Sequence, residues 1–270
     1  MARSPATTTR TMVVGAIAAG ILAAAPSVAR AQEMSMGPPR EPLVITPRVG
    51  IETGWTRFDL NGSRGDAYGV TARLDVRASR IVGLRLLLPV YALDLDGRST
   101  QVGLGDAELR VRILVLDDHD WRMYVGLSDQ LPTGNNGIGL GQGGTQLSPF
   151  VTAGWRNGGL VLYGTLADVV ALHSQGNPPA FDYVDPSSDH EARYSLGAIF
   201  DAFGPVYANA ALTGVTVLTP TDAGSTFVYG GVAIGLLLGE YWKLVASAQL
   251  PIAGEHRFES KVGLNLYFYF

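Results

Sequence analysis

Charged side chains occupy every second position in one stretch of the chain, as Asp106, Glu108, Arg110 and Arg112. An extended strand sends successive side chains to opposite faces, so these four charges share one face and the intervening apolar residues share the other. Charges lining a confined channel select ions of the opposite sign. The spacing therefore predicts ion selection inside a lumen, provided that the apolar face of the strand meets lipid.

The same two-residue period recurs along the rest of the chain, with turn residues between the segments. In the segments 145–156, 160–172 and 205–218 it is weak, so the sequence leaves their facing open. Pro89 cannot donate a ladder hydrogen bond, so we expect a bulge or a strand end there. Strands are expected at 44–57, 67–77, 81–93, 101–116, 121–131, 145–156, 160–172, 191–201, 205–218, 226–238, 241–252 and from Lys261 to the C-terminus.

Lumen-lining positions follow from the face of each strand that carries charge. The side chains expected to point inward include nine basic and four acidic residues, which predicts a basic interior. The alternative is that these charges pair across strands and only stabilise the wall. The full set, with two tyrosines, is Arg48, Glu52, Arg73, Asp75, Arg77, Arg85, Tyr91, Asp106, Glu108, Arg110, Arg112, Arg122, Tyr124, Arg193 and Lys243.

The fold class predicted from these strands is all-β, a transmembrane antiparallel up-and-down β-barrel of about 12 strands. After residue 31 no apolar run is long enough for a helical span, which needs about 18–20 residues. Unpaired backbone groups are costly in hydrocarbon, so the sheet is expected to close on itself. Expected connections are short after even-numbered strands and mostly longer after odd-numbered strands, as in outer-membrane barrels with both termini in the periplasm.

Three parts of the chain are distinguished by composition. Residues 1–31 read as a signal peptide, with Arg3 and Arg10 before a short apolar core and an Ala29-Arg30-Ala31 cleavage site. Residues 32–42 are expected to form a short periplasmic tail, and residues 43–270 the barrel. Removing residues 1–31 leaves 17 basic and 24 acidic residues, or −7. Because no basic run is present, no nucleic-acid partner is expected.

The last strand ends in four consecutive aromatic residues, with Phe270 at the C-terminus. Alternation with a terminal phenylalanine resembles the targeting signature of bacterial outer-membrane barrels. The expected location is therefore the outer membrane, and the expected partners are outer-membrane lipid and the barrel-assembly machinery. A buried last strand of a soluble protein explains the alternation but not a free carboxylate beside four consecutive aromatic residues.

Catalytic, metal and cofactor sites are not expected. His173 and Ser174 are adjacent and would point to opposite faces of a strand, whereas a hydrolase needs them within reach. Asp189-His190 could form an acid–base pair in a loop. The absence of cysteine excludes thiolate metal sites and disulfides. The glycine-rich stretch 134–144 lacks the ending of a phosphate-binding loop and predicts an outer loop, with folding into the lumen as an alternative.

A family resemblance rests on three short runs: Leu87-Leu88-Pro89-Val90, Gly103 to Arg110 (GLGDAELR), and Leu131-Pro132-Thr133-Gly134. Together they resemble the outer-membrane transporter family labelled "MetA-pathway of phenol degradation". The resemblance implies a barrel that helps aromatic or other hydrophobic compounds to cross the outer membrane. It would cover most of the chain after residue 31.

The function that these observations favour is passage of small organic anions, such as carboxylates, through the lumen. Tyr91 and Tyr124 would contact the apolar parts of the solute. Two alternatives are a barrel with a structural or adhesion role and, less favoured, a barrel hydrolase.

Overall fold

The computed structural model describes residues 43–60, 63–172, 182–184, 186–219, 223–254 and 257–270. The predicted signal peptide (1–31) and tail (32–42) lie outside the described residues. In the described part of the chain, no helix has the length and hydrophobicity to cross a membrane.

Most of the described chain is β-strand, as the two-residue hydrophobic period predicts. Within the described residues, one short 3-10 helix, η1 (Asn136–Ile138), accompanies the strands. The strands are β1 (Arg48–Leu60), β2 (Ser63–Arg77), β3 (Val82–Leu95), β4 (Gln101–Leu104), β5 (Ala107–Asp117), β6 (Trp121–Leu131), β7 (Thr145–Asn157), β8 (Leu160–Leu172), β9 (His190–Phe203), β10 (Val206–Val217), β11 (Thr226–Leu238), β12 (Trp242–Gly254) and β13 (Ser260–Tyr269).

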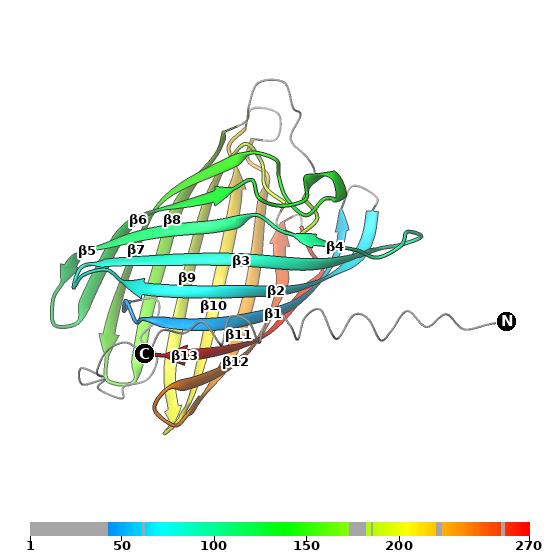
Figure 1. The fold of residues 1–270 in the computed structure, drawn as a ribbon. Coiled ribbons are helices and arrows are strands. Elements are labelled where there is room, and N and C mark those ends of the chain that lie inside the picture. Colours follow the sequence, from blue (N-terminus) through cyan, green and yellow to red (C-terminus); the bar gives the residue numbers. More distant parts are fainter. Residues whose placement is uncertain (1–42, 61–62, 173–181, 185, 220–222, 255–256) are drawn as a thin grey trace. The chain divides into compact units, whose positions relative to one another are not determined.

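Except for β4 and β5, each strand pairs antiparallel with its neighbours in the chain, and β1 pairs with β13 to close the sheet (Figure 1). The closing ladder runs from Arg48 opposite Tyr269 to Arg57 opposite Ser260. β4 and β5 both pair with β3 and together form one wall strand, so the described residues build a closed 12-stranded barrel. Closure leaves no open sheet edge, which satisfies backbone hydrogen bonding in lipid.

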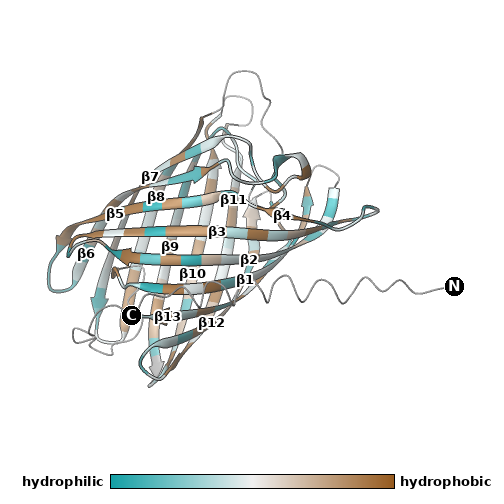
Figure 2. Cartoon of the chain, in the orientation of Figure 1, coloured by the Kyte–Doolittle hydropathy of each residue, from teal (hydrophilic) through white to brown (hydrophobic). Residues whose placement is uncertain are grey.

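The outer surface of the barrel is apolar. Hydrophobic and hydrophilic residues alternate along the strands (Figure 2), and the exposed large side chains include Leu196, Val232, Ile234 and Leu264. The same exposure pattern resolves the strands whose facing the sequence left open. Leu162 and Leu166 of β8 and Leu212 of β10 are exposed, while Val161, Val169, Tyr207 and Val215 are buried.

Two expectations about strand limits are corrected. The expected strand 101–116 is interrupted at Gly105 and Asp106, opposite Pro89, while β3 continues through Pro89. The irregularity therefore lies in the partner strand. The Pro89 carbonyl accepts a hydrogen bond from the Gly105 N–H at 3.0 Å, but proline has no N–H to donate in return.

The strands expected at 44–57 and 67–77 are also too short at the end where they join, because β1 and β2 continue as a paired hairpin to Leu60 and Ser63. Ion pairs between Arg57 and Asp66 and between Arg64 and Asp59 join the two strands of this extension.

The two ends of the barrel differ in their connections. We call the end with the tight turns 78–81, 118–120, 158–159, 204–205 and 239–241 the short-turn end. The other end, with the longer connections, is the loop end. Chain segments pack into the barrel at both ends.

At the loop end, the segment 133–144 packs against the inner wall. Leu140 is 1% exposed and contacts a cluster that contains Phe58, Leu93 and Val184. The Asp106 carboxylate accepts the N–H of Gly134 at 2.7 Å and that of Gln142 at 2.9 Å. The glycine-rich loop is therefore fixed inside the loop end of the barrel.

At the short-turn end, Leu43 to Ile45 cross the interior before β1 begins. Leu43 is buried among Val161 of β8, Ile199 of β9 and Tyr207 of β10. Ile45 lies against β3, where a Cβ added at Gly83 would be 2.8 Å from its Cγ2. Since β1 neighbours β2 and β13, this segment reaches the opposite wall of the barrel.

Candidate functional site

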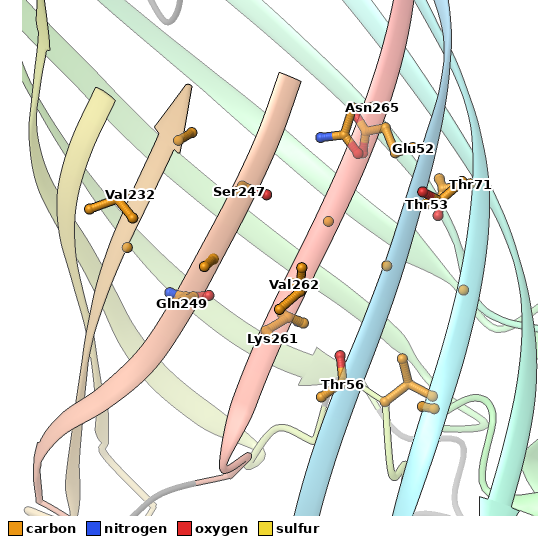
Figure 3. Close-up of a pocket in the computed structure, with 18 of the residues that line it drawn as sticks. Glu52, Thr53, Thr56, Thr71, Val232, Ser247, Gln249, Lys261, Val262 and Asn265 are labelled. Carbon is orange, nitrogen blue, oxygen red and sulfur yellow. The ribbon is translucent and has the colours of Figure 1, made fainter. Parts of the chain in front are cut away.

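The interior of the barrel holds a chamber of about 470 Å³. Its wall is formed mainly by β1, β2 and β10 to β13, and Figure 3 shows the labelled side chains on these strands. Glycines and small apolar residues form the larger part of the lining, which also has neutral hydrogen-bonding side chains, one carboxylate from Glu52 and one ammonium group from Lys261. Val184, from the cluster at the loop end, is also part of the lining.

A charged network adjoins this chamber on β1, β2 and β3. The Asp75 carboxylate, 4% exposed, accepts hydrogen bonds from the Nε atoms of Arg48, Arg73 and Arg85 at 2.6, 2.7 and 2.7 Å. Arg73 also donates to Glu52 at 2.7 Å, which connects the network to the chamber wall. Three guanidinium groups thus share one buried carboxylate.

The charged surface continues onto β5. Arg110 lies directly opposite Arg85 in the β3–β5 ladder, and it pairs with Glu108 at 2.8 Å. Arg112, two residues further along β5, donates to the Val44 carbonyl at 2.9 Å. We refer to Arg48, Arg73, Arg85, Arg110 and Arg112, with the carboxylates Glu52, Asp75 and Glu108, as the arginine wall.

Aromatic rings support several of these cations. The Arg110 guanidinium lies 5.3 Å from the Phe150 ring centroid, and that of Arg112 lies 5.2 Å from the Tyr124 centroid. Arg48 is 4.4 Å from the ring of Tyr267, whose hydroxyl donates to Glu52 at 2.9 Å. Cation–π contacts of this kind stabilise charges that have partly lost water.

The side of the chamber formed by β10 to β13 is chemically different. Apart from Lys261 of β13, its inward residues are small or neutral, and they include Ala211, Gly231, Ala233, Ser247 and Gly263. Positive charge is therefore concentrated on one side of the interior, facing a smooth side with little charge.

The remaining residues predicted to line the lumen lie at the following places. Arg77 is exposed near the short-turn end, where Arg122 pairs with Asp117 at 2.7 Å. Tyr91 lines the chamber. Lys243, 3% exposed, lies 4.8 Å from the Tyr207 ring centroid.

Two of the predicted residues lie at the loop end. Asp106 holds the segment 133–144, as described above. Arg193 pairs with the fully buried Glu191 at 3.1 Å, and Arg257 pairs with the same carboxylate.

The sequence did not identify Phe150, Thr152, Thr165, Tyr207 or Tyr267 as interior residues. Tyr267 could have been found, because it lies between Leu266 and Phe268 in an alternating strand and so points to the opposite face. Phe150, Thr152, Thr165 and Tyr207 lie in the three weakly alternating segments, so no sequence signal placed them. The contribution of Leu43 and Ile45 depends on a crossing of the lumen that no local pattern encodes.

The histidines do not form a recognisable metal or hydrolase centre in the described part of the chain. His190 Nε2 lies 2.7 Å from Asp168 Oδ1, so its partner is not the adjacent Asp189. His190 and Asp168 alternate with the inward residues and share the face that carries Leu166 and Tyr194. Among the described residues, no group of three or more potential metal ligands is found. His173 and His256 lie outside the described residues.

Comparison with known proteins gives structural matches only. No family model matches the chain, and no curated protein matches it. An outer-membrane channel from Pseudomonas putida F1 superimposes with a TM-score of 0.66 at 12% identity, covering 87% of this chain and 99% of that one.

Two porins give further matches. The NanC porin gives a TM-score of 0.58 at 11% identity and covers 82% of this chain and 98% of its own. The KdgM porin, solved in complex with oligogalacturonate, gives 0.55 at 9% identity and covers 82% of this chain and 99% of its own. At these identities the likeness establishes the fold. This chain has the fold of a bacterial outer-membrane β-barrel.

Proposed function

We propose that this protein is an outer-membrane channel for small organic anions. The observation that carries the proposal is the composition of the arginine wall, in which five arginines face three carboxylates. The excess positive charge lies inside a protein whose formal net charge is −4. A charged surface in a confined space attracts ions of opposite sign and repels those of like sign.

The dimensions of the chamber support passage of a small solute. Its volume of about 470 Å³ lies within the roughly 300–1,000 Å³ typical of small-molecule sites. Neutral amides and hydroxyls, such as those of Asn209, Gln249 and Thr71, would exchange hydrogen bonds with a polar solute as it moves. Tyr91, on the same lining, offers an apolar surface.

The structural matches support a channel, since two of them are porins and a third is an outer-membrane channel. Galacturonate, named in the KdgM complex, is a carboxylate, which is consistent with the anionic solute class proposed here. The resemblance to the "MetA-pathway of phenol degradation" family favours a solute with an aromatic part. A small aromatic carboxylate has both the anionic group and the aromatic part.

We place the barrel in contact with outer-membrane lipid through its apolar outer face. The C-terminal strand ending at Phe270 is the proposed recognition element for the barrel-assembly machinery. No catalytic role is proposed, because the His190–Asp168 pair lies on the face opposite to the chamber.

The proposal is tested by reversal potentials of the purified barrel in planar bilayers under a potassium chloride gradient. Anion preference at neutral pH is the expected result, and cation preference contradicts it. Uptake of sodium acetate and of an inorganic sodium salt into liposomes that contain the barrel provides a second measurement. No current and no uptake, even in the variant with a loosened N-terminal segment described in the Discussion, would instead favour the structural role.

A further inference from the structure

A second, smaller cavity of about 90 Å³ lies beside the arginine wall, on β3, β5, β6, β7 and β8. Three arginines line it, and none of its described lining residues is acidic. The lining consists of Gly83, Leu84, Arg85, Arg110, Arg112, Tyr124, Phe150, Thr152 and Thr165. From this composition we infer that the cavity, here called the Arg85–Arg110 pocket, binds the carboxylate group of a small organic anion. The inference deepens the proposed function and rests on it.

The positions of the arginines do not favour the stability of the sheet. Arg85 and Arg110 lie directly opposite one another across the β3–β5 ladder. Like charges at directly opposed positions destabilise a sheet. Arg112 is on the same face of β5, so a third positive charge is added nearby. An anion bound between them would relieve this repulsion.

The arginines are held in place and still have donors to offer. Arg85 uses its Nε–H to reach Asp75 at 2.7 Å, and Arg110 uses its Nε and Nη2 groups on Glu108 at 2.9 and 2.8 Å. A guanidinium group has five N–H donors in a fixed plane, which suits two-point binding of a carboxylate. Asp75 and Glu108 fix the arginines from outside the pocket, since neither belongs to its lining.

The rest of the lining favours an organic anion over an inorganic one. The ring of Phe150 stacks near Arg110 and also faces the pocket, so it offers an apolar surface to the carbon part of the ligand. The hydroxyls of Thr152 and Thr165 lie 2.9 Å apart, and either can donate to the other while its partner donates to a ligand oxygen. The volume is several times the roughly 10–15 Å³ needed by one water, which is enough for a carboxylate group and its first carbons.

The pocket is connected to the chamber by a continuous series of charged side chains. Glu52 lines the chamber and binds Arg73, Arg73 and Arg85 share Asp75, and Arg85 lines the pocket. An anion that enters the chamber is therefore attracted towards the pocket along one wall. This places the pocket as a binding station on the permeation path.

The test measures binding of sodium benzoate and sodium acetate to the purified full-length mature barrel in detergent by isothermal titration calorimetry. We expect Arg110→Gln to weaken carboxylate binding about tenfold or more, because a charge-assisted hydrogen-bonded pair is lost. Glu108→Gln is expected to strengthen it, since this change removes a competing negative charge. Arg77→Gln is the matched control, because Arg77 is exposed and outside the pocket lining, and it should bind as the wild type does.

The opposite effects expected of Arg110→Gln and Glu108→Gln distinguish the proposal from general damage to the barrel. Phe150→Leu is a variant that keeps all charges, and it should weaken benzoate binding more than acetate binding. Folding of each variant is checked by the heat-dependent mobility shift on electrophoresis. Benzoate affinity unchanged in both Arg110→Gln and Phe150→Leu would overturn the pocket, as would sulfate binding as tightly as either carboxylate.

The pocket and the proposed function can fail separately. Anion-selective currents combined with unaltered carboxylate binding in the pocket variants would reject the pocket and leave the channel proposal standing. Cation-selective currents combined with loss of benzoate binding in Arg110→Gln would reject anion conduction and retain the pocket.

Discussion

Asp75 is the residue on which the arginine wall depends most directly. Its carboxylate is buried and binds three arginines, so its charge compensates a region where several cations have lost water. A buried ion pair contributes little when its desolvation is counted, but removal of one partner leaves an uncompensated charge. Loss of Asp75 would therefore leave Arg48, Arg73 and Arg85 without their shared carboxylate.

Replacing Asp75 with asparagine is expected to destabilise the barrel by about 3–5 kcal/mol. The same change should increase anion selectivity in the molecules that fold, because positive charge is left uncompensated. The measurement is urea-induced unfolding of the refolded barrel, followed by tryptophan fluorescence.

Asp59→Asn provides the control for this prediction. Its ion pair with Arg64 has one partner that is 70% exposed, so a loss below about 1 kcal/mol is expected. Equal destabilisation by Asp59→Asn and Asp75→Asn would show that burial of the network has no special role.

At the scale of the strand, alternation gives adjacent residues opposite environments. Leu264 of β13 is 51% exposed on the outer face, whereas its neighbour Asn265 lines the chamber opposite Glu52. An arginine at position 264 would meet lipid, at a cost of about 2–4 kcal/mol near the middle of the membrane. An arginine at position 265 would find a carboxylate directly across the ladder.

We therefore predict that Leu264→Arg destabilises the refolded barrel more than Asn265→Arg by about 2–4 kcal/mol. Equilibrium folding into lipid vesicles measures the difference. A larger loss for Asn265→Arg than for Leu264→Arg would mean that the facing of β13 is reversed.

The segment before β1 is an element without regular secondary structure, yet it is held by specific contacts. The Tyr124 hydroxyl donates to the Leu43 carbonyl at 3.0 Å, and Arg112 donates to that of Val44. Burial of each large apolar side chain contributes about 1.5–3 kcal/mol relative to exposure. Leu43 and Ile45 thus supply much of the free energy that keeps the segment in the lumen.

Replacing both Leu43 and Ile45 with glycine is expected to release the segment from the short-turn end and to increase conductance. Single-channel recordings before and after the substitution measure this effect. Val49→Gly and Ile51→Gly, made together on the outward-facing side of β1, form the control for loss of apolar side chains near the N-terminal end of the barrel. Conductance equal to that of the wild type in the Leu43/Ile45 variant would show that the segment does not limit passage.

At the scale of the whole molecule, closure depends on the ladder between the first and last strands. This ladder ends at the pair of Arg48 and Tyr269, so Phe270 is not needed for closure. Its aromatic ring is nevertheless 47% exposed at the chain end. Recognition by an assembly partner is a role that fits a residue outside the closing ladder.

Deletion of Phe270 is expected to reduce assembly into the outer membrane of cells while refolding of the purified protein in detergent remains unchanged. Membrane fractionation and the heat-dependent mobility shift provide the two measurements. Impaired refolding in detergent would assign Phe270 to the stability of the barrel instead.

Prediction from the sequence succeeds for strands whose own residues show which face points into the lumen. The alternation in β2, β3 and β5 requires only that the strand be extended, and it placed Arg73, Arg85 and Arg110 on one face before any pairing was known. It failed for β7 and β8, because alanine, glycine and threonine fit both lipid and lumen. Phe150 and the threonine pair could therefore not be placed.

The sequence by itself determined that this chain forms a closed antiparallel barrel. Strands with one apolar face can lie in lipid only if all their backbone groups are paired, and closure of the sheet achieves this. Only the tertiary structure decided which interior residues meet. The pairing register brings Arg85 opposite Arg110, and packing across the lumen brings Leu43 to β8 and Leu140 to Phe58. These contacts join residues far apart in the chain, and their energies depend on burial that a local period of two residues does not specify.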